Sequence, residues 1–137
     1  MFTESSFAAF QRTPRFNSAN YAIGHAAEIA QLGAIRAFFD DPNIEPLSAG
    51  HTFDFESPTR LIELKTRRVK RLTYYDTAIG ANKIRFARCS EKEVVFVFGF
   101  TDGLFYWRYD PALALRAGPL LGVPHHFIPV SELKPMF

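Results

Sequence analysis

The run of residues 94–100, VVFVFGF, constrains the fold more than any other feature, because every position in it is apolar or glycine. β-Branched and aromatic residues favour strands, and a run without polar alternation indicates a strand that is covered on both faces. Thr101-Asp102-Gly103 supplies turn-forming residues, and residues 104–109, LFYWRY, are strand-like again. The sequence therefore predicts a buried hairpin that needs other elements on both sides.

Two segments have the apolar spacing of helices that could cover such a hairpin. The first extends from about residue 21 to residue 39 and ends at the turn-forming run 40–43, DDPN. The second is predicted from residue 75 to about residue 87, with Gly80 as a weak point. One stripe of the first helix is mostly apolar and contains Tyr21, His25, Glu28, Leu32, Ile35 and Phe39.

Further strands are predicted between the two helices and at the end of the chain. Residues 44–48 and 52–57 form a hairpin around Gly50, and residues 61–67, LIELKTR, alternate at the period of a strand. A short helix is expected from Asp110-Pro111 to Arg116, and residues 127–130 are expected to return as an edge strand. The order is helix, three strands, helix and two strands, which predicts an α/β fold with a mixed sheet flanked by helices.

Composition limits the classes of protein to which the chain can belong. Its 137 residues, 47% of them hydrophobic, predict a single domain that spans residues 1–137. Cys89 is the only cysteine, which excludes an internal disulfide and favours a reducing compartment. Neither a secretory leader nor a membrane span is evident, so we expect an intracellular protein of the cytoplasm or nucleoid that has no membrane partner.

Positive charge is concentrated in one part of the chain. Residues 60–88 contain nine basic and two acidic residues, a net charge of +7, although the whole chain carries only +2. Such a segment predicts a phosphate-binding face, while a solvated strand edge protected by its charges is an equally good interpretation.

Three charged residues are predicted to share one site. Residues two apart on a strand point to the same face, so Glu63 and Lys65 project together. Asp54 lies between two phenylalanines, and a neighbouring strand about 5 Å away can bring it beside Glu63. Because two carboxylates repel each other, this pair favours a hard divalent cation such as Mg²⁺.

The spacing of Asp54, eight residues and then Glu63-Leu64-Lys65 resembles the PD-(D/E)XK nucleases, and so does the order of elements. The resemblance implies a restriction-endonuclease-like core and a DNA endonuclease or nickase that depends on Mg²⁺ or Mn²⁺. It covers about residues 20–100, with Phe53 where the motif has proline. Residues 80–84 and 100–107 resemble small nucleases of phages and large DNA viruses, for which the location would be the host cell.

The resemblance also implies roles for individual residues. Asp54, Glu63 and the backbone carbonyl of Leu64 would bind the metal ion, Lys65 would position the attacking water, and Glu28 would complete the catalytic set. DNA, or alternatively RNA, would be held by the basic segment, for which the expected contacts are Arg67, Arg68, Lys70, Arg71, Lys83 and Arg85.

Other interpretations of the same residues remain open at this stage. Glu63 and Lys65 can form an ordinary ion pair on a half-exposed strand, and Glu28 can face solvent. A nucleic-acid-binding module without turnover, an RNA nuclease and a structural subunit of a nucleoprotein complex are alternative functions. A homodimer is expected only if the protein cuts both strands of a duplex, because that needs two active sites.

Overall fold

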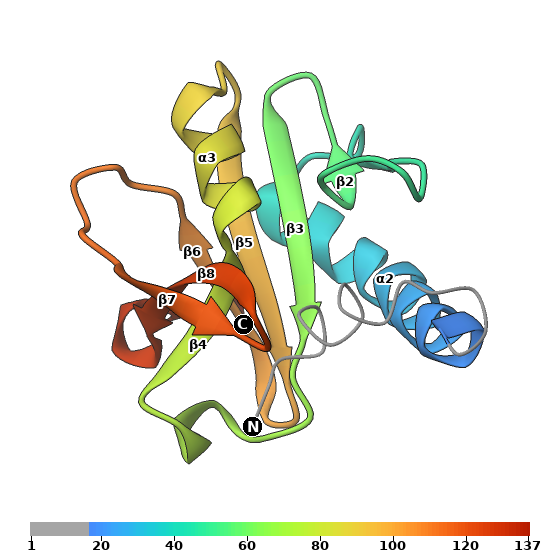
Figure 1. Ribbon diagram of the computed structural model, residues 1–137. Helices are drawn as coiled ribbons and strands as arrows, with labels where there is room; N and C mark the ends of the chain where they lie inside the picture. The colour runs from blue at the N-terminus through green and yellow to red at the C-terminus, as the bar shows by residue number, and fades with distance from the viewer. Residues whose placement is uncertain (1–16) are drawn as a thin grey trace.

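The computed structural model describes residues 17–137, with side chains from residue 28 onward and at Ala26. The elements keep the labels of Figure 1. In chain order they are α2 (Asn17–Phe39), β1 (Glu45–Pro46), β2 (Phe55–Glu56), β3 (Arg60–Thr66), the 3-10 helix η1 (Arg71–Thr73), β4 (Asp76–Gly80), α3 (Ala81–Cys89), β5 (Glu93–Phe100), β6 (Gly103–Arg108), β7 (Arg116–Leu120), β8 (Val123–Pro129), the 3-10 helix η2 (Val130–Glu132) and β9 (Lys134–Pro135).

The fold is α/β and is built around a mixed sheet of six strands in the order β1-β2-β3-β5-β6-β9. β3 and β5 are parallel, and every other neighbouring pair in this sheet is antiparallel. Helix α2 lies behind the sheet, while α3 and a second sheet, with the order β4-β8-β7, lie in front of it (Figure 1). The predicted α/β class and mixed sheet are therefore confirmed.

Strand β5 is the centre of the molecule, as its uninterrupted apolar run predicts. Val95 and Val97 belong to the apolar cluster that contains α2 residues, whereas Phe96 and Phe98 belong to the cluster on the other face. All four side chains are fully buried. Because full burial of each such side chain stabilises a fold by about 1.5–3 kcal/mol, this strand makes a large contribution to the core.

Helix α2 covers one face of the sheet through its predicted stripe. Ile35 and Phe39 are buried against Ile62 and Leu64 of β3, and Leu32 packs beside them. The helix ends at Asp40, whose φ of 49° leaves the helical region. The side chains of Tyr21 and His25, which belong to the same predicted stripe, lie outside the described residues. No helix within residues 17–137 is long and apolar enough to cross a bilayer.

Both predicted hairpins are present. Glu45 and Pro46 of β1 pair antiparallel with β2, although each of these strands has only two residues. β5 and β6 pair over six positions around the turn at residues 101–102. The predicted strand at residues 61–67 is β3, which begins one residue earlier and ends at Thr66.

The predicted start of the second helix was wrong. Residues 76–80 form strand β4, and α3 begins only at Ala81. Thr77, Ala78 and Ile79 are all buried, because β4 has the apolar interior on one side and pairs with β8 along its edge. This pairing joins segments about fifty residues apart, and no local periodicity reveals it.

Two predictions for the C-terminal region were also wrong. Residues 111–115 form turns instead of a helix, since the Asp110 side chain accepts a hydrogen bond from the Ala112 N–H at 2.9 Å and β7 then starts at Arg116. Residues 127–129 belong to β8, which is the central strand of the second sheet and not an edge. Its prolines, Pro124 and Pro129, lie near the two ends of the strand.

Arg67 joins the two sheets. Only 2% of this residue is exposed, and its guanidinium group donates to the Thr77 hydroxyl and to the Ala78 carbonyl of β4, both at 2.8 Å. The same group lies 5.5 Å from the ring centroid of Phe98. Arg67 therefore faces the interior, and its neighbour Arg68 is exposed.

We predict that Arg67→Ala lowers the free energy of unfolding by about 2–4 kcal/mol, because it leaves two buried acceptors without a donor and opens a cavity. Arg68→Ala is the control and should change it by about 0.5 kcal/mol or less. Urea unfolding followed by the fluorescence of Trp107, the single tryptophan, measures both values. Equal stabilities for the two variants would mean that the link between the sheets contributes nothing.

Candidate active site

The candidate site lies at the edge of β3 that faces β2. On β3, Ile62 and Leu64 pack toward α2, so Glu63 and Lys65 point to the face that carries α3 and the second sheet. β2 pairs with β3 only at Leu61 and Ile62. Beyond Ile62, the edge of β3 is therefore not covered by β2.

The side chain of Asp54 occupies the place where β2 stops pairing. The Asp54 backbone N–H donates to the Ile62 carbonyl at 3.1 Å, and its carboxyl Oδ2 accepts from the Leu64 N–H at 2.7 Å. Phe53 and Phe55 are buried on either side and anchor this segment. Because the N–H and C=O of one strand residue point to the same edge, the Leu64 carbonyl is directed toward the side on which Asp54 lies.

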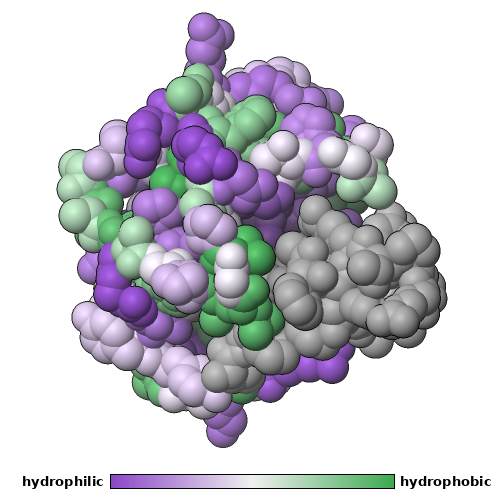
Figure 2. Space-filling model, in the orientation of Figure 1, coloured by the Kyte–Doolittle hydropathy of each residue, from purple (hydrophilic) through white to green (hydrophobic). Residues whose placement is uncertain are grey.

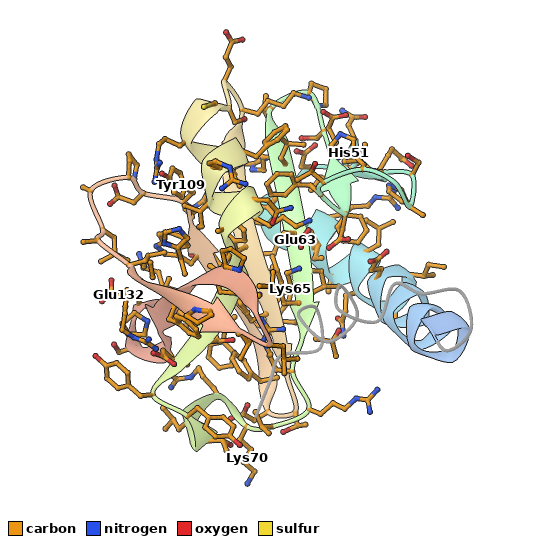
Figure 3. The ribbon with its side chains drawn as sticks, viewed as in Figure 1. His51, Glu63, Lys65, Lys70, Tyr109 and Glu132 are labelled. Carbon is orange, nitrogen blue, oxygen red and sulfur yellow. The ribbon has the colours of Figure 1, made fainter. Side chains whose placement is uncertain are left out.

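Glu63 is the most enclosed charged group of the site, with 2% of the residue exposed. Its Oε2 forms an ion pair with Lys65 Nζ and lies 3.3 Å from Lys83 Nζ. Lys83 comes from the first turn of α3 and also donates to the Thr52 carbonyl. Figure 3 shows Glu63 and Lys65 together on β3 in the middle of the molecule. One buried carboxylate is thus held between two lysines.

The two carboxyl groups titrate in opposite directions. Burial, followed by the negative charges of Glu63 and Glu28, raises the pKa of Asp54 to about 9 against the opposing effects of Lys65 and of the hydrogen bond from Leu64. Burial would also raise the pKa of Glu63, but Lys65 and Lys83 outweigh that effect and lower it. At neutral pH, Glu63 therefore carries the charge and Asp54 keeps its proton. Burial lowers the pKa of the Lys65 ammonium group, while Glu63 opposes this.

Glu28 lies on α2 and is half-buried. Its charge contributes to the raised pKa of Asp54, so it acts on the site electrostatically. The structure therefore brings together Asp54, Glu63 and Lys65, with the Leu64 carbonyl on the same edge and Glu28 near enough to affect the pair.

The donor groups of this edge fit a hard divalent cation. Asp54 and Glu63 supply carboxylate oxygens and Leu64 a carbonyl oxygen, which is the type of ligand that Mg²⁺ prefers. Within the part of the chain that the structure describes, no group of three or more His, Cys, Asp and Glu side chains could hold a metal ion. A cation here would have to take its remaining ligands from water or substrate, as Mg²⁺ commonly does.

The predicted nucleic-acid contacts do not share one face. Arg67 is buried between the sheets, and Arg71 donates through its backbone N–H to Asp102 and holds its guanidinium group 4.8 Å from the Phe105 ring centroid. Arg68 and Lys70 are exposed at the end of the molecule that follows β3, where Figure 3 labels Lys70. Lys83 and Arg85 are on α3, where Lys83 lies beside Glu63. The basic segment is therefore divided between two regions.

Lys83 has a closer relation to the site than the sequence suggested. It was expected to contact phosphate, yet it lies within 3.5 Å of both oxygens of Glu63. In the structure, α3 starts directly after Gly80, so Lys83 lies in its first turn and reaches the chain segment before Asp54. The predicted start at residue 75 hid this relation.

Comparison with known proteins adds no further information about the site. The chain matches no protein-family profile, no curated protein and no solved structure.

We predict that Asp54→Asn stabilises the metal-free protein. The folded pKa of Asp54 lies far above the unfolded value of 3.8, so its stabilising contribution is complete below about pH 4 and is lost as the pH rises toward 9. Asparagine resembles the protonated acid, because it can still accept from the Leu64 N–H and donate to Glu63, and it does not ionise. We expect a gain of about 2 kcal/mol at pH 8 and little at pH 4.

Thermal unfolding at several pH values measures this gain. Asp110→Asn is the matched control, since Asp110 is exposed and an amide oxygen preserves its bond to the Ala112 N–H. A gain for Asp54→Asn that does not depend on pH would show that Asp54 is not protonated in the folded state.

Proposed function

We propose that this protein is a metal-dependent nuclease with a PD-(D/E)XK site that hydrolyses phosphodiester bonds in DNA. The observation that carries the proposal is that the Leu64 N–H holds the Asp54 carboxyl on the part of the β3 edge that β2 does not cover, where Asp54 interacts with Glu63 and Glu63 forms an ion pair with Lys65. The element order α2, β1, β2, β3, α3, β5 also supports it, with β4 inserted before α3.

In the proposed enzyme, Asp54, Glu63 and the Leu64 carbonyl would bind the cation. A bound Mg²⁺ or Mn²⁺ supplies polarisation of the phosphate and a nucleophilic hydroxide near neutral pH. Asp54 must lose its proton for this, and its fixed bond from the Leu64 N–H keeps the carboxyl oriented through that change. The protein therefore supplies a set of ligands that is already in position.

Lys65 is suited to the chemical step. Its ammonium group is held by Glu63 in a buried position, and burial lowers its pKa toward the range in which a lysine exchanges a proton. In this role it orients the attacking water and offsets the negative charge that grows on the phosphate in the transition state. Glu28 acts through its charge on Asp54, which makes it a positioning residue.

The cation and the Asp54 proton should compete, so we predict that divalent-ion affinity depends on pH. Affinity for Mn²⁺ should rise by up to about tenfold per pH unit between pH 6 and 8, since one proton must leave a group whose pKa is about 9. Calorimetry in buffers of different ionisation enthalpy measures the released protons. Binding that releases no proton would place the metal ion elsewhere.

The enzyme itself is tested with a Lys65→Met variant, which removes the charge and keeps most of the side-chain volume. We expect cleavage to fall about a hundredfold or more while DNA affinity in Ca²⁺ changes little, because the interaction is made mainly in the transition state. Single-turnover cleavage of labelled duplex, flap, junction and single-stranded DNA and RNA with Mg²⁺ measures the rate.

Lys134→Met is the matched control, because Lys134 is an exposed lysine on β9, at the edge of the six-stranded sheet opposite to β1 and β2. It should cleave at the rate of the parent. If the parent cleaves no substrate in the panel, yet binds nucleic acid, the protein is a binding module and the nuclease proposal fails.

A further inference from the structure

Helix α3 divides its side chains between several surroundings. Ile84 and Ala87 are buried in the core, and Lys83 points to Glu63. A third set, at the helical spacing i, i+3, i+4, i+7, lines an open groove of about 710 Å³ and consists of Asn82, Arg85, Phe86 and Cys89. The proposed reaction uses none of these four side chains.

The groove borders the chain segment that leads into the candidate active site. Thr52 lines it, and the carbonyl of the same residue accepts the hydrogen bond from Lys83. Phe86 is 40% exposed and makes an edge contact, with ring centroids 5.2 Å apart, with Phe53, the residue before Asp54. A molecule seated against Phe86 would therefore lie near the segment that carries Asp54.

The charges around the groove suit a nucleobase at one end and phosphate at the other. Glu56 pairs with Lys92 at 2.7 Å, so their charges offset each other, and Glu91 adds a negative charge to that end of the groove. Arg85 is exposed and is the basic side chain among the α3 residues that line the groove, so it supplies positive charge at α3. Figure 2 shows hydrophilic side chains gathered over α3 with hydrophobic ones beside them.

We propose that this groove binds a single-stranded segment of nucleic acid, with an unstacked base against Phe86 and the adjoining phosphate near Arg85. Aromatic side chains bind bases of any sequence by stacking, and a base inside a duplex cannot reach such a wall without leaving its stack. The inference rests on the proposed function and adds a substrate class, which is nucleic acid with an unpaired strand next to the cleaved bond.

Cys89 offers a test on the unmodified chain, because it is the only cysteine, is exposed and lines the groove. The rate of its reaction with a maleimide is measured with saturating oligothymidylate and with an equivalent duplex, in Ca²⁺ and in EDTA. We expect oligothymidylate to slow the reaction by about tenfold and the duplex to have little effect. Oligothymidylate that binds, as judged by fluorescence anisotropy, without protecting Cys89 would overturn the groove proposal.

A second test compares Phe86→Leu with Phe137→Leu. Phe137 is 78% exposed and its ring contacts Phe38, so it is a matched control away from the groove. Phe86→Leu should weaken binding of oligothymidylate by about tenfold and abolish protection of Cys89, and Phe137→Leu should do neither.

The outcomes separate the two proposals. Protection of Cys89 without cleavage of any substrate would support the groove and overturn the nuclease. Cleavage of duplex DNA without protection of Cys89 by oligothymidylate would support the nuclease and overturn the groove. No binding to any nucleic acid would overturn both.

Discussion

The parallel pairing of β3 with β5 is the constraint on which the site depends. In this register Glu63 lies opposite Phe96 and Lys65 opposite Phe98, so the two charged residues share a face with the large side chains of the core. Burying a charge is costly unless it is paired, and here each charge is paired with the other. The burial of β5 in the core therefore holds β3, and with it the Glu63–Lys65 pair, in a fixed position.

The candidate site also depends on the shortness of β2. A longer β2 would place backbone groups along β3, whereas here the Asp54 side chain accepts the hydrogen bond from the Leu64 N–H in their place. The carboxyl group then lies near Glu63 in a buried place, where it keeps its proton at neutral pH. Burial of an ionisable carboxyl group beside a second carboxylate lowers stability at neutral pH.

Local patterns predicted the elements that depend on local physics. The run at residues 94–100 and the alternation at 61–67 each determine a strand and its faces, so the placement of Glu63 with Lys65 could be predicted. Strand β4 could not be predicted in this way. Ala78 and Ile79 suit a helix or a strand, and the pairing with β8 decides between them. Arg67 does lie on the same face as Lys65, as alternation predicts. It was expected to contact DNA, but β4 covers it, and its guanidinium group binds β4 in the interior.

The four side chains in direct contact also have a charge balance that suits the proposed substrate. With Asp54 protonated, Glu63 contributes one negative charge and Lys65 and Lys83 contribute two positive ones, so this set carries a net charge of +1. A phosphodiester carries one negative charge and would balance it. When a divalent cation replaces the Asp54 proton, the set becomes more positive by one, which favours the doubly charged transition state over the ground state. If the protein acts as proposed, the same lysines that allow Glu63 to be buried would also favour hydrolysis of a phosphodiester at this edge.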